Sequence, residues 1–252
     1  MNPLVNRVEG VKRSLRQLAG AHATWAVVII LLAIQLAVEW GGGYRSLPWW
    51  FEIFGLTRSG QKHGELWQLV SYALLHGNWL HVLVNCACLL MLGGKLEHAL
   101  GSGVVLRAML WGALGGAAVH LLLASPDRPG SMLVGSSGAV YGLLILSITL
   151  APESQLWPFR LSGRALGMML LTTSLLLALI DPMLDLPGFS RAGRWLSANG
   201  FGNWWAIGHA CHFGGGVAGW GYGRWLLRPR ITLERLRRQR ARRERQPSST
   251  ES

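Results

Sequence analysis

Two short stretches of the sequence carry residues that could perform nucleophilic catalysis. The first is GSSG, in which Ser137 lies between Ser136 and Gly138, and the second is HFGGG, which begins at His212. A serine hydroxyl becomes a good nucleophile when a neighbouring base takes its proton, and histidine is the usual base because its pKa lies near neutrality. The pair therefore predicts an acyl-transfer site, provided that the fold brings the two residues together.

A third stretch could supply the hydrogen-bond donors that such a site needs. His81 and Asn85 are four residues apart, so on a helix their side chains point the same way. Acyl transfer passes through an oxyanion, which N–H donors stabilise. A helix that begins at Ser137 would add free backbone N–H groups and a positive dipole end. Tyr141, one turn further along that helix, is placed to stack on the imidazole of the base.

Ser136 is an alternative nucleophile because the hydroxyl is duplicated. Successive helical residues point about 100° apart, so only one of the two serines can face His212. The register of the motif favours Ser137, and Ser136 is then expected to cap the helix. The aspartates fall in loops, and Glu39 and Glu97 fall at the ends of apolar segments, so we expect a dyad rather than a triad.

The histidines could instead bind a metal, since His209 and His212 are three residues apart with Cys211 between them. His76 and His81, in contrast, are five residues apart and would point in different directions on a regular helix. The sequence has no HExxH motif and no CxxC pair. We therefore expect neither a metal site nor another cofactor.

Six apolar segments must position these residues. Hydrophobic residues make up 50% of the chain and charged residues 14%, which is typical of a membrane protein. About 20 apolar residues cross a bilayer as a helix. We therefore predict an all-α, polytopic membrane protein with a bundle of six transmembrane helices. The predicted segments are Trp25–Val38, Leu80–Gly94, Ala108–Ala124, Val134–Ala151, Ala165–Ile180 and Trp204–Gly223.

Small residues predict how the fourth and sixth segments meet. Gly138 and Gly142 are four apart in the fourth segment, and Gly215 and Gly219 are four apart in the sixth. Small residues at this spacing let two helix backbones approach closely. Each pair of glycines forms a stripe of small residues along one face of its helix. Contact between these two glycine stripes would bring Ser137 and His212 to hydrogen-bond distance.

The charge distribution predicts the topology. The net charge is +12, residues 1–22 are basic, and the segment from Arg224 onward holds ten arginines. With six spans both termini lie on one side, and the positive-inside rule places that side in the cytoplasm. His212 would then lie about eight residues into the sixth segment, roughly 12 Å below the outer surface. The fourth helix should accordingly be short and sunk, with a preceding loop that dips into the protein.

The chain is thus expected to comprise a basic cytoplasmic segment (1–22), a six-span membrane domain (23–228) and a basic, partly disordered tail (229–252). The arginines of the tail would retain this topology, and anionic lipid could assist them. No aromatic residues are interleaved for base stacking, so nucleic acid is not expected as a partner.

In their order along the chain, the three motifs resemble those of the rhomboid family of intramembrane serine proteases. HGNWLHVLVN is similar to the family's H-x4-H-x3-N pattern, GSSG to its G-x-S-G motif, and HFGGGVAG to its H-x2-G-x3-G pattern. The matching positions are His76, His81, Asn85, Gly135, Ser137, Gly138, Tyr141, His212, Gly215 and Gly219.

The resemblance implies that Ser137 is the nucleophile and His212 the general base. It also implies that His81, Asn85 and the backbone N–H of Ser137 bind the oxyanion, with His76, Gly135 and Tyr141 in support. The implied activity is cleavage of transmembrane or juxtamembrane segments of other membrane proteins. The nearest type is the bacterial six-span core, in the inner membrane.

Two further expectations depend on the resemblance. The first loop, Gly41 to Trp67, is implied to lie partly in the membrane. Gln68 stands where many members have arginine after the tryptophan, so one charged contact to this loop is not expected. The alternative function is that of a catalytically inactive relative that binds or escorts membrane proteins; such relatives usually lack the serine or the histidine.

Overall fold

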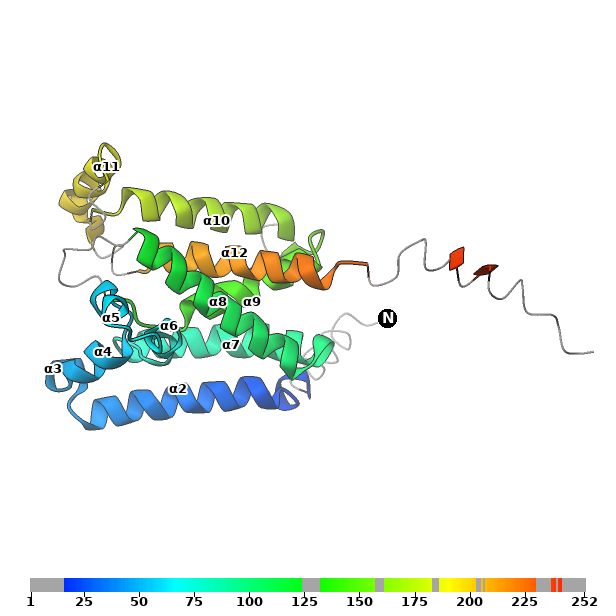
Figure 1. Ribbon diagram of the computed structural model, residues 1–252, viewed down its shortest axis with the longest axis horizontal. Coiled ribbons are helices and arrows are strands. Elements are labelled where there is room, and N and C mark those ends of the chain that lie inside the picture. The colour runs from blue at the N-terminus through cyan, green and yellow to red at the C-terminus, as the bar shows by residue number, and fades with distance from the viewer. Residues whose placement is uncertain are drawn as a thin grey trace, which may run out of the picture.

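Helices run along the longest axis of the computed structural model and pack into a bundle (Figure 1). The structure describes residues 16–123, 132–156, 161–182, 186–202, 205, 207–229, 237–238 and 240–241. The bundle helices are α2 (His22–Trp40), α7 (Trp79–Leu100), α8 (Ser102–Leu123), α9 (Ser137–Leu150), α10 (Gly163–Ile180) and α12 (His209–Leu226). The shorter elements are α3 (Gly43–Ser46), α4 (Pro48–Phe54), α5 (Arg58–Lys62), α6 (Gln68–Ser71), η1 (Tyr72–Leu74), α11 (Phe189–Leu196) and η3 (Ser197–Phe201).

The prediction of an all-α membrane bundle is confirmed. Four helices, α2, α7, α8 and α10, are long and apolar enough to cross a membrane, and α9 is a shorter apolar helix of 14 residues. The sixth bundle helix, α12, is rich in glycine and carries two histidines. Among the described residues, the strands are confined to one antiparallel hairpin of two-residue strands, β1 (Gln155–Leu156) and β2 (Leu161–Ser162).

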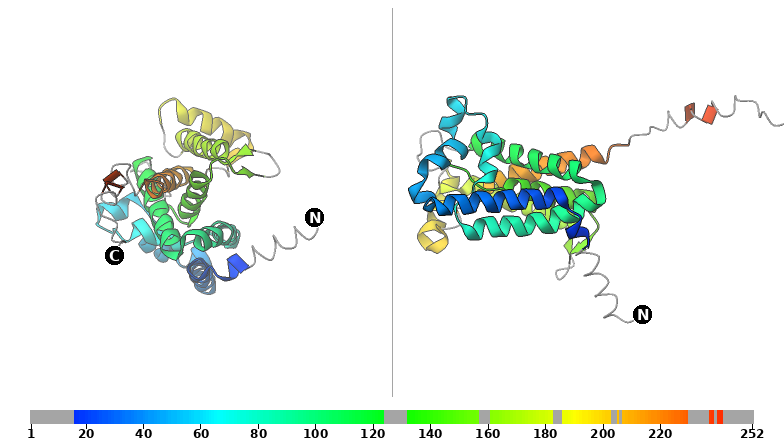
Figure 2. Two further views of the ribbon diagram at one scale, coloured as in Figure 1. Left: turned by 90° about the vertical axis from the view of Figure 1, so that its right-hand side faces the viewer. Right: turned by 90° about the horizontal axis from the view of Figure 1, so that it is seen from below.

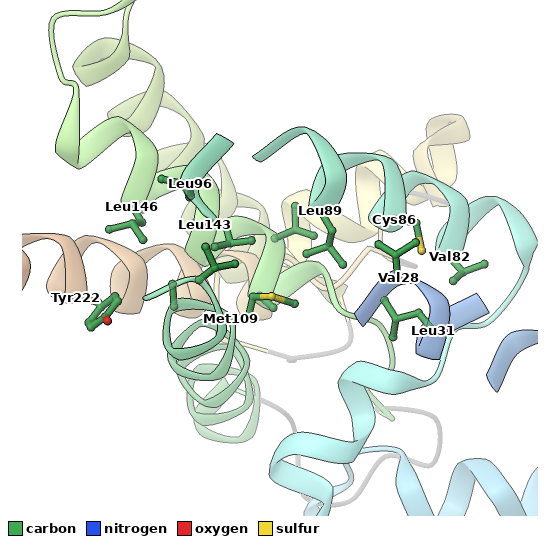
Figure 3. Close-up of a cluster of buried hydrophobic side chains, with 14 residues drawn as sticks. Val28, Leu31, Val82, Cys86, Leu89, Leu96, Met109, Leu143, Leu146 and Tyr222 are labelled. Carbon is green, nitrogen blue, oxygen red and sulfur yellow. The ribbon is translucent and has the colours of Figure 1, made fainter. Parts of the chain in front are cut away.

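Large apolar side chains fill the side of the bundle where α2 and α7 meet. Leu31 of α2 and Leu89 of α7 are buried in one cluster, which continues through Met109 of α8 to Leu143 of α9 (Figure 3). Seen along the bundle, α2 and α7 lie beside each other and α10 lies on the far side of α12 (Figure 2). Burial of these side chains holds together the helices that surround the three sequence motifs.

A buried carboxylate clamps the ends of three helices. Glu97 of α7 accepts hydrogen bonds from the backbone N–H groups of Ala23 and Thr24, each at 2.9 Å, and from the Thr24 hydroxyl at 2.7 Å. It also accepts one from the hydroxyl of Ser102, the first residue of α8, at 2.8 Å. Helix α2 has no side-chain cap of its own, so this carboxylate satisfies N–H groups that its first turn leaves without a partner.

Two helices begin five or six residues away from the expected starts of their apolar segments. Helix α8 begins at Ser102 rather than at Ala108, because Gly101 at φ 84° ends α7 and the helix restarts at once. Helix α12 begins at His209, because Gly208 at the preceding position has a non-helical ψ of 68°. The expected start at Trp204 falls on a residue outside the described part of the chain. His212 is therefore in the first turn of α12, and its placement about eight residues into the helix was wrong.

The boundaries expected for the terminal segments remain predictions. Residues 1–15, residues 124–131 of the loop before Ser137, and most of the tail lie outside the described residues. The expected boundaries at 22 and 229 are therefore untested. The first loop folds into short helices with exposed aromatic side chains, among them Trp49 and Trp67, and its immersion in a membrane is likewise still a prediction.

Candidate active site

The segment before α9 is fixed from two sides. The backbone N–H of Gly135 donates to the carbonyl of Tyr72 at 2.9 Å, and Leu133 pairs with Leu56 of the first loop through two backbone hydrogen bonds. Gly135 has φ 114°, and a Cβ there would lie 2.6 Å from Cε1 of His81. Only glycine fits both the backbone conformation and the contact. The chain then enters α9, with Ser137 as its first residue.

Glycine contacts bring α9 and α12 together at the level of the backbone. A Cβ at Gly215 would overlap the carbonyl of Gly138, and a Cβ at Gly219 would overlap the carbonyl of Gly142. The two stripes therefore face each other directly. Helix α8 joins the same contact, since a Cβ at Gly112 would lie 2.8 Å from the Gly138 carbonyl oxygen.

The ring of His212 stacks on the ring of Tyr141. Their centroids are 4.2 Å apart and their planes differ by 11°. Tyr141 is one turn after Ser137 on α9, so the stack holds the imidazole beside the helix that the serine begins. Both Ser137 and His212 are partly exposed. Among the hydrogen bonds of the described residues, none joins the Ser137 hydroxyl to the His212 ring.

Helix α7 presents two further polar side chains. His81 is in its first turn, where Asn78 caps the helix by accepting from the His81 backbone N–H at 2.9 Å. Asn85, one turn on, is 4% exposed, and its Nδ2 is buried without a partner among the described residues. An unpartnered buried amide is unusual, because the loss of its hydrogen bonds to water is not offset. Such a donor is available to an incoming acceptor.

His76 makes contacts that the sequence did not predict. Its ring meets that of His81 edge to face with centroids 4.9 Å apart, so the expectation that the two point apart was wrong. The reason is that His76 precedes α7 and is not bound by helical geometry. The Ser136 backbone N–H donates to His76 Nε2 at 3.3 Å, and the Ser136 hydroxyl lies 3.3 Å from the same nitrogen.

Ser136 therefore does not use its side chain as a helix cap, as had been expected. It occupies the position before α9, but its hydroxyl makes no capping hydrogen bond. Burial, reinforced by the charge of His81, lowers the pKa of His76 to about 3. The ring is thus neutral at ordinary pH, as an acceptor of the Ser136 N–H must be.

Gln68 anchors the first loop without a charge. It is fully buried, and its Oε1 accepts from the backbone N–H of Thr57 at 3.0 Å. Its Nε2 donates to the carbonyl of Glu52 at 3.0 Å and to the carboxylate of Glu65 at 2.6 Å. The residue that departs from the family pattern therefore still ties the loop to α6.

No group of three or more His, Cys, Asp or Glu side chains in the described segments is arranged to hold a metal. Cys211 is fully buried and lies 3.6 Å from the hydroxyl of Tyr72, which donates to the Ala113 carbonyl at 2.8 Å. Tyr72 thus connects the segment before α9 with α8 and α12. Sequence reasoning missed both this tyrosine and the glycines of α8, although the spacing of Gly112 and Gly116 was a visible signal.

The helical bundle and the apolar lengths of its helices define a multi-pass integral membrane protein. Residues 63–229 match the family profile described as "Rhomboid domain". The match covers more than half of the chain, so the protein belongs to the rhomboid family.

Relatives with similar sequences include a bacterial protein and a plant protein. The chain is 33% identical over 132 residues to the rhomboid protease GlpG of Pectobacterium atrosepticum, a match that covers 52% of this chain and 44% of that protein. It is 35% identical over 99 residues to RHOMBOID-like protein 5 of Arabidopsis thaliana, covering 39% of this chain and 31% of the relative. These matches span less than half of each relative's length.

Proposed function

We propose that the protein is an intramembrane serine endopeptidase in which Ser137 is the nucleophile and His212 the general base. One observation carries the proposal: the imidazole of His212 is stacked on Tyr141, one turn from Ser137, where glycine contacts bring the two helices together. The similarity to proteins named rhomboid protease supports the same reaction.

In the proposed reaction, the Ser137 hydroxyl attacks the carbonyl carbon of the scissile peptide and His212 takes its proton. The oxyanion that forms accepts hydrogen bonds from Asn85, from His81 and from the backbone N–H of Ser137. His212 then gives its proton to the departing amine. Water hydrolyses the acyl-enzyme by the same steps in reverse, and the free serine is restored. The buried, unpartnered amide of Asn85 supports its role as a donor.

The substrates are transmembrane or juxtamembrane segments of other membrane proteins, in a bacterial inner membrane. Both termini lie in the cytoplasm, and the membrane domain extends from residue 23 to residue 228. The arginines of the tail support this orientation, and anionic lipid is the proposed partner of that tail.

The test is cleavage of a labile transmembrane substrate by the purified protein in lipid vesicles. The parent should cut it, while Ser137→Ala and His212→Ala should lose at least about a thousandfold in rate. Ser154→Ala, at an exposed loop serine, is the matched control and should cut like the parent. If the folded parent leaves every substrate intact, the chain is an inactive relative that binds membrane proteins. If Ser137→Ala cuts like the parent, the assignment of the nucleophile is wrong.

A further inference from the structure

Helix α11 is an amphipathic helix whose apolar face points away from the protein. It connects α10 to α12 and lies at the same end of the bundle as α3, α4 and α5, at the left of Figure 1. Phe189 is 55% exposed and Trp195 is 65% exposed. The apolar face of an amphipathic helix normally packs onto the core. Here it does not.

The small residues of α11, not the apolar ones, make the contact with the bundle. Ser190 and Gly193 are three apart, share one face and are buried. The Ser190 hydroxyl donates to the Asp181 carbonyl at 3.1 Å, directly after the end of α10. A Cβ at Gly193 would overlap the carbonyl of Ile180. Helix α11 is therefore docked against the end of α10 by a face that carries no large side chain.

Apart from the half-buried Leu196, the remaining residues of α11 separate into two faces. Phe189, Ala192 and Trp195 follow one another at three-residue spacing and are all exposed. Arg191 and Arg194 share the adjacent face, and both are exposed as well. The helix thus presents an apolar face and a cationic face side by side, and both faces are exposed.

The depth of α11 follows from the helix against which it is docked. Helix α10 has 18 residues and is one of the candidate membrane spans. Its length is about 27 Å, close to the hydrocarbon thickness of a bilayer, so its ends lie near the two membrane surfaces. Tryptophan and phenylalanine beside arginine are typical of a helix that lies in the plane of the interface.

We propose that α11 is an interfacial helix that binds the phospholipid surface at this end of the bundle. Phe189, Ala192 and Trp195 enter the boundary between headgroups and acyl chains, and Arg191 contacts anionic phosphate. The chain continues from α11 through η3 to α12, so the lipid contact fixes one end of the segment that precedes His212. This inference does not depend on the proposed peptidase activity.

The experiment places an environment-sensitive fluorescent amino acid at position 192 or at position 191, by codon suppression in the full chain. Both side chains are exposed, so either probe should leave the fold intact. In vesicles, brominated lipid should quench the probe at 192 roughly twofold more than the probe at 191, and aqueous iodide should show the opposite preference. Equal quenching by iodide at the two positions, or protection of 192 from both quenchers, would overturn the proposal. Protection from both would mean that protein covers this face.

A second arm tests the choice of lipid. Quenching at 192 by brominated lipid should be stronger in vesicles that contain phosphatidylglycerol than in phosphatidylcholine alone, because the arginine is attracted to the anionic surface. Arg191→Gln should remove this difference. Arg224→Gln, an exposed arginine near the end of α12, is the matched control and should retain it. If Arg191→Gln leaves the difference unchanged, the proposed headgroup contact is wrong.

Discussion

The helices of this bundle meet in two different ways. Between α2 and α7, branched and long side chains interlock, and the Glu97 carboxylate ties the helix ends together. Between α9 and α12, glycines bring backbone against backbone, with α8 in the same contact. The first arrangement can adjust when a side chain changes, because rotamers can shift. At the glycines of the second, backbone meets backbone and no side chain is there to move; this contact lies between the helices that carry Ser137 and His212.

In this bundle, the residues with the strictest positions are those that offer no side chain at all. A core of large side chains tolerates exchange when its volume is kept. A contact between backbones tolerates only glycine, and so it can fix the distance between two helices within narrow limits. The two kinds of contact should therefore respond very differently to small substitutions.

The largest effect is expected for Gly219→Ala. The new methyl group would overlap the carbonyl of Gly142, and neither backbone can yield without separating the helices. We expect a loss of about 3 kcal/mol or more in the free energy of unfolding, at the upper end for overpacking, together with loss of peptidase activity. Unfolding in mixed detergent micelles measures the first quantity.

Gly221→Ala is the matched control on the same helix. A Cβ at Gly221 would meet nothing within 4 Å. The substitution should be neutral or stabilise the protein by up to about 1 kcal/mol, because alanine is the better helix former. Equal destabilisation by Gly219→Ala and Gly221→Ala would show that the close α9–α12 contact is not what makes glycine necessary at position 219.

The next effect is expected for Glu97→Gln, on the other side of the bundle. The neutral amide keeps the shape but retains only one acceptor oxygen for four donors, two of which are backbone N–H groups. We expect a loss of about 2 kcal/mol in the free energy of unfolding, since buried donors are left without partners.

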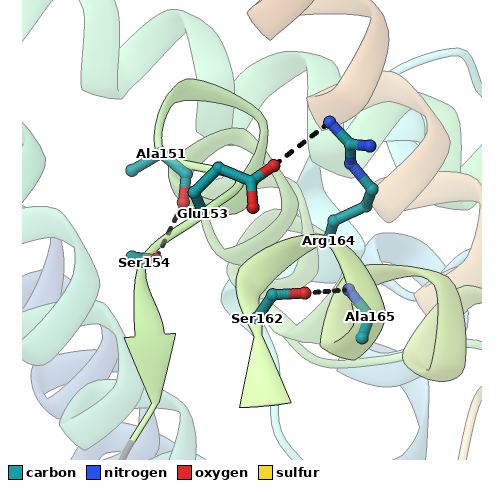
Figure 4. A network of polar contacts seen from close by, with 6 residues as sticks. All are labelled: Ala151, Glu153, Ser154, Ser162, Arg164 and Ala165. Carbon is teal, nitrogen blue, oxygen red and sulfur yellow. Dashed lines mark hydrogen bonds and ion pairs between the residues drawn. The ribbon is translucent and has the colours of Figure 1, made fainter. Parts of the chain in front are cut away.

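Glu153→Gln serves as its control. Glu153 forms an exposed ion pair with Arg164 at 3.3 Å, beside the hairpin that precedes α10 (Figure 4). Exposed pairs contribute between about 0 and 1 kcal/mol, so the change in unfolding should be small. If Glu153→Gln lowered the free energy of unfolding as much as Glu97→Gln, the importance assigned to the buried Glu97 carboxylate would be contradicted.

A smaller effect is expected for Gln68→Glu. The carboxylate cannot donate to the Glu52 carbonyl, and it adds a second negative charge beside Glu65. We expect kcat/KM to fall about tenfold, because hydrogen bonds that hold the first loop are lost. Gln61→Glu, which removes a single hydrogen bond to the Glu65 backbone, should have the weaker effect. If Gln61→Glu lowered kcat/KM more than Gln68→Glu, Gln68 would be excluded as the anchor of this loop.

The smallest effect is expected at Tyr141. Tyr141→Phe keeps the ring that stacks on His212 and should leave the rate of cleavage unchanged. Tyr141→Leu removes the stack and should lower the rate about fivefold, the equivalent of about 1 kcal/mol for an aromatic pair. If the phenylalanine variant were the slower of the two, the hydroxyl and not the ring would be the important group.

The sequence predicted the helices and the glycine contacts because both depend on local patterns. Long apolar segments and the four-residue spacing of glycines can be recognised in the sequence without knowing how the helices pack. The start of α12 could not be read in this way, because Trp204 and its neighbours continue the apolar pattern and only the backbone angle at Gly208 shows where the helix begins. The contacts of His76 and Gln68 lie between segments distant in sequence, which periodicity does not reveal.

Of the two adjacent hydroxyls, we propose that the one of Ser137 reacts. Ser136 is buried against His76, whereas Ser137 is partly exposed and begins the helix on which His212 stacks. The direct measurement is to label the protein in vesicles with a fluorophosphonate and to locate the adduct by mass spectrometry. The adduct should be on Ser137 and should be lost in His212→Ala. An adduct on Ser136, or one on Ser137 that forms equally fast without His212, would contradict the account.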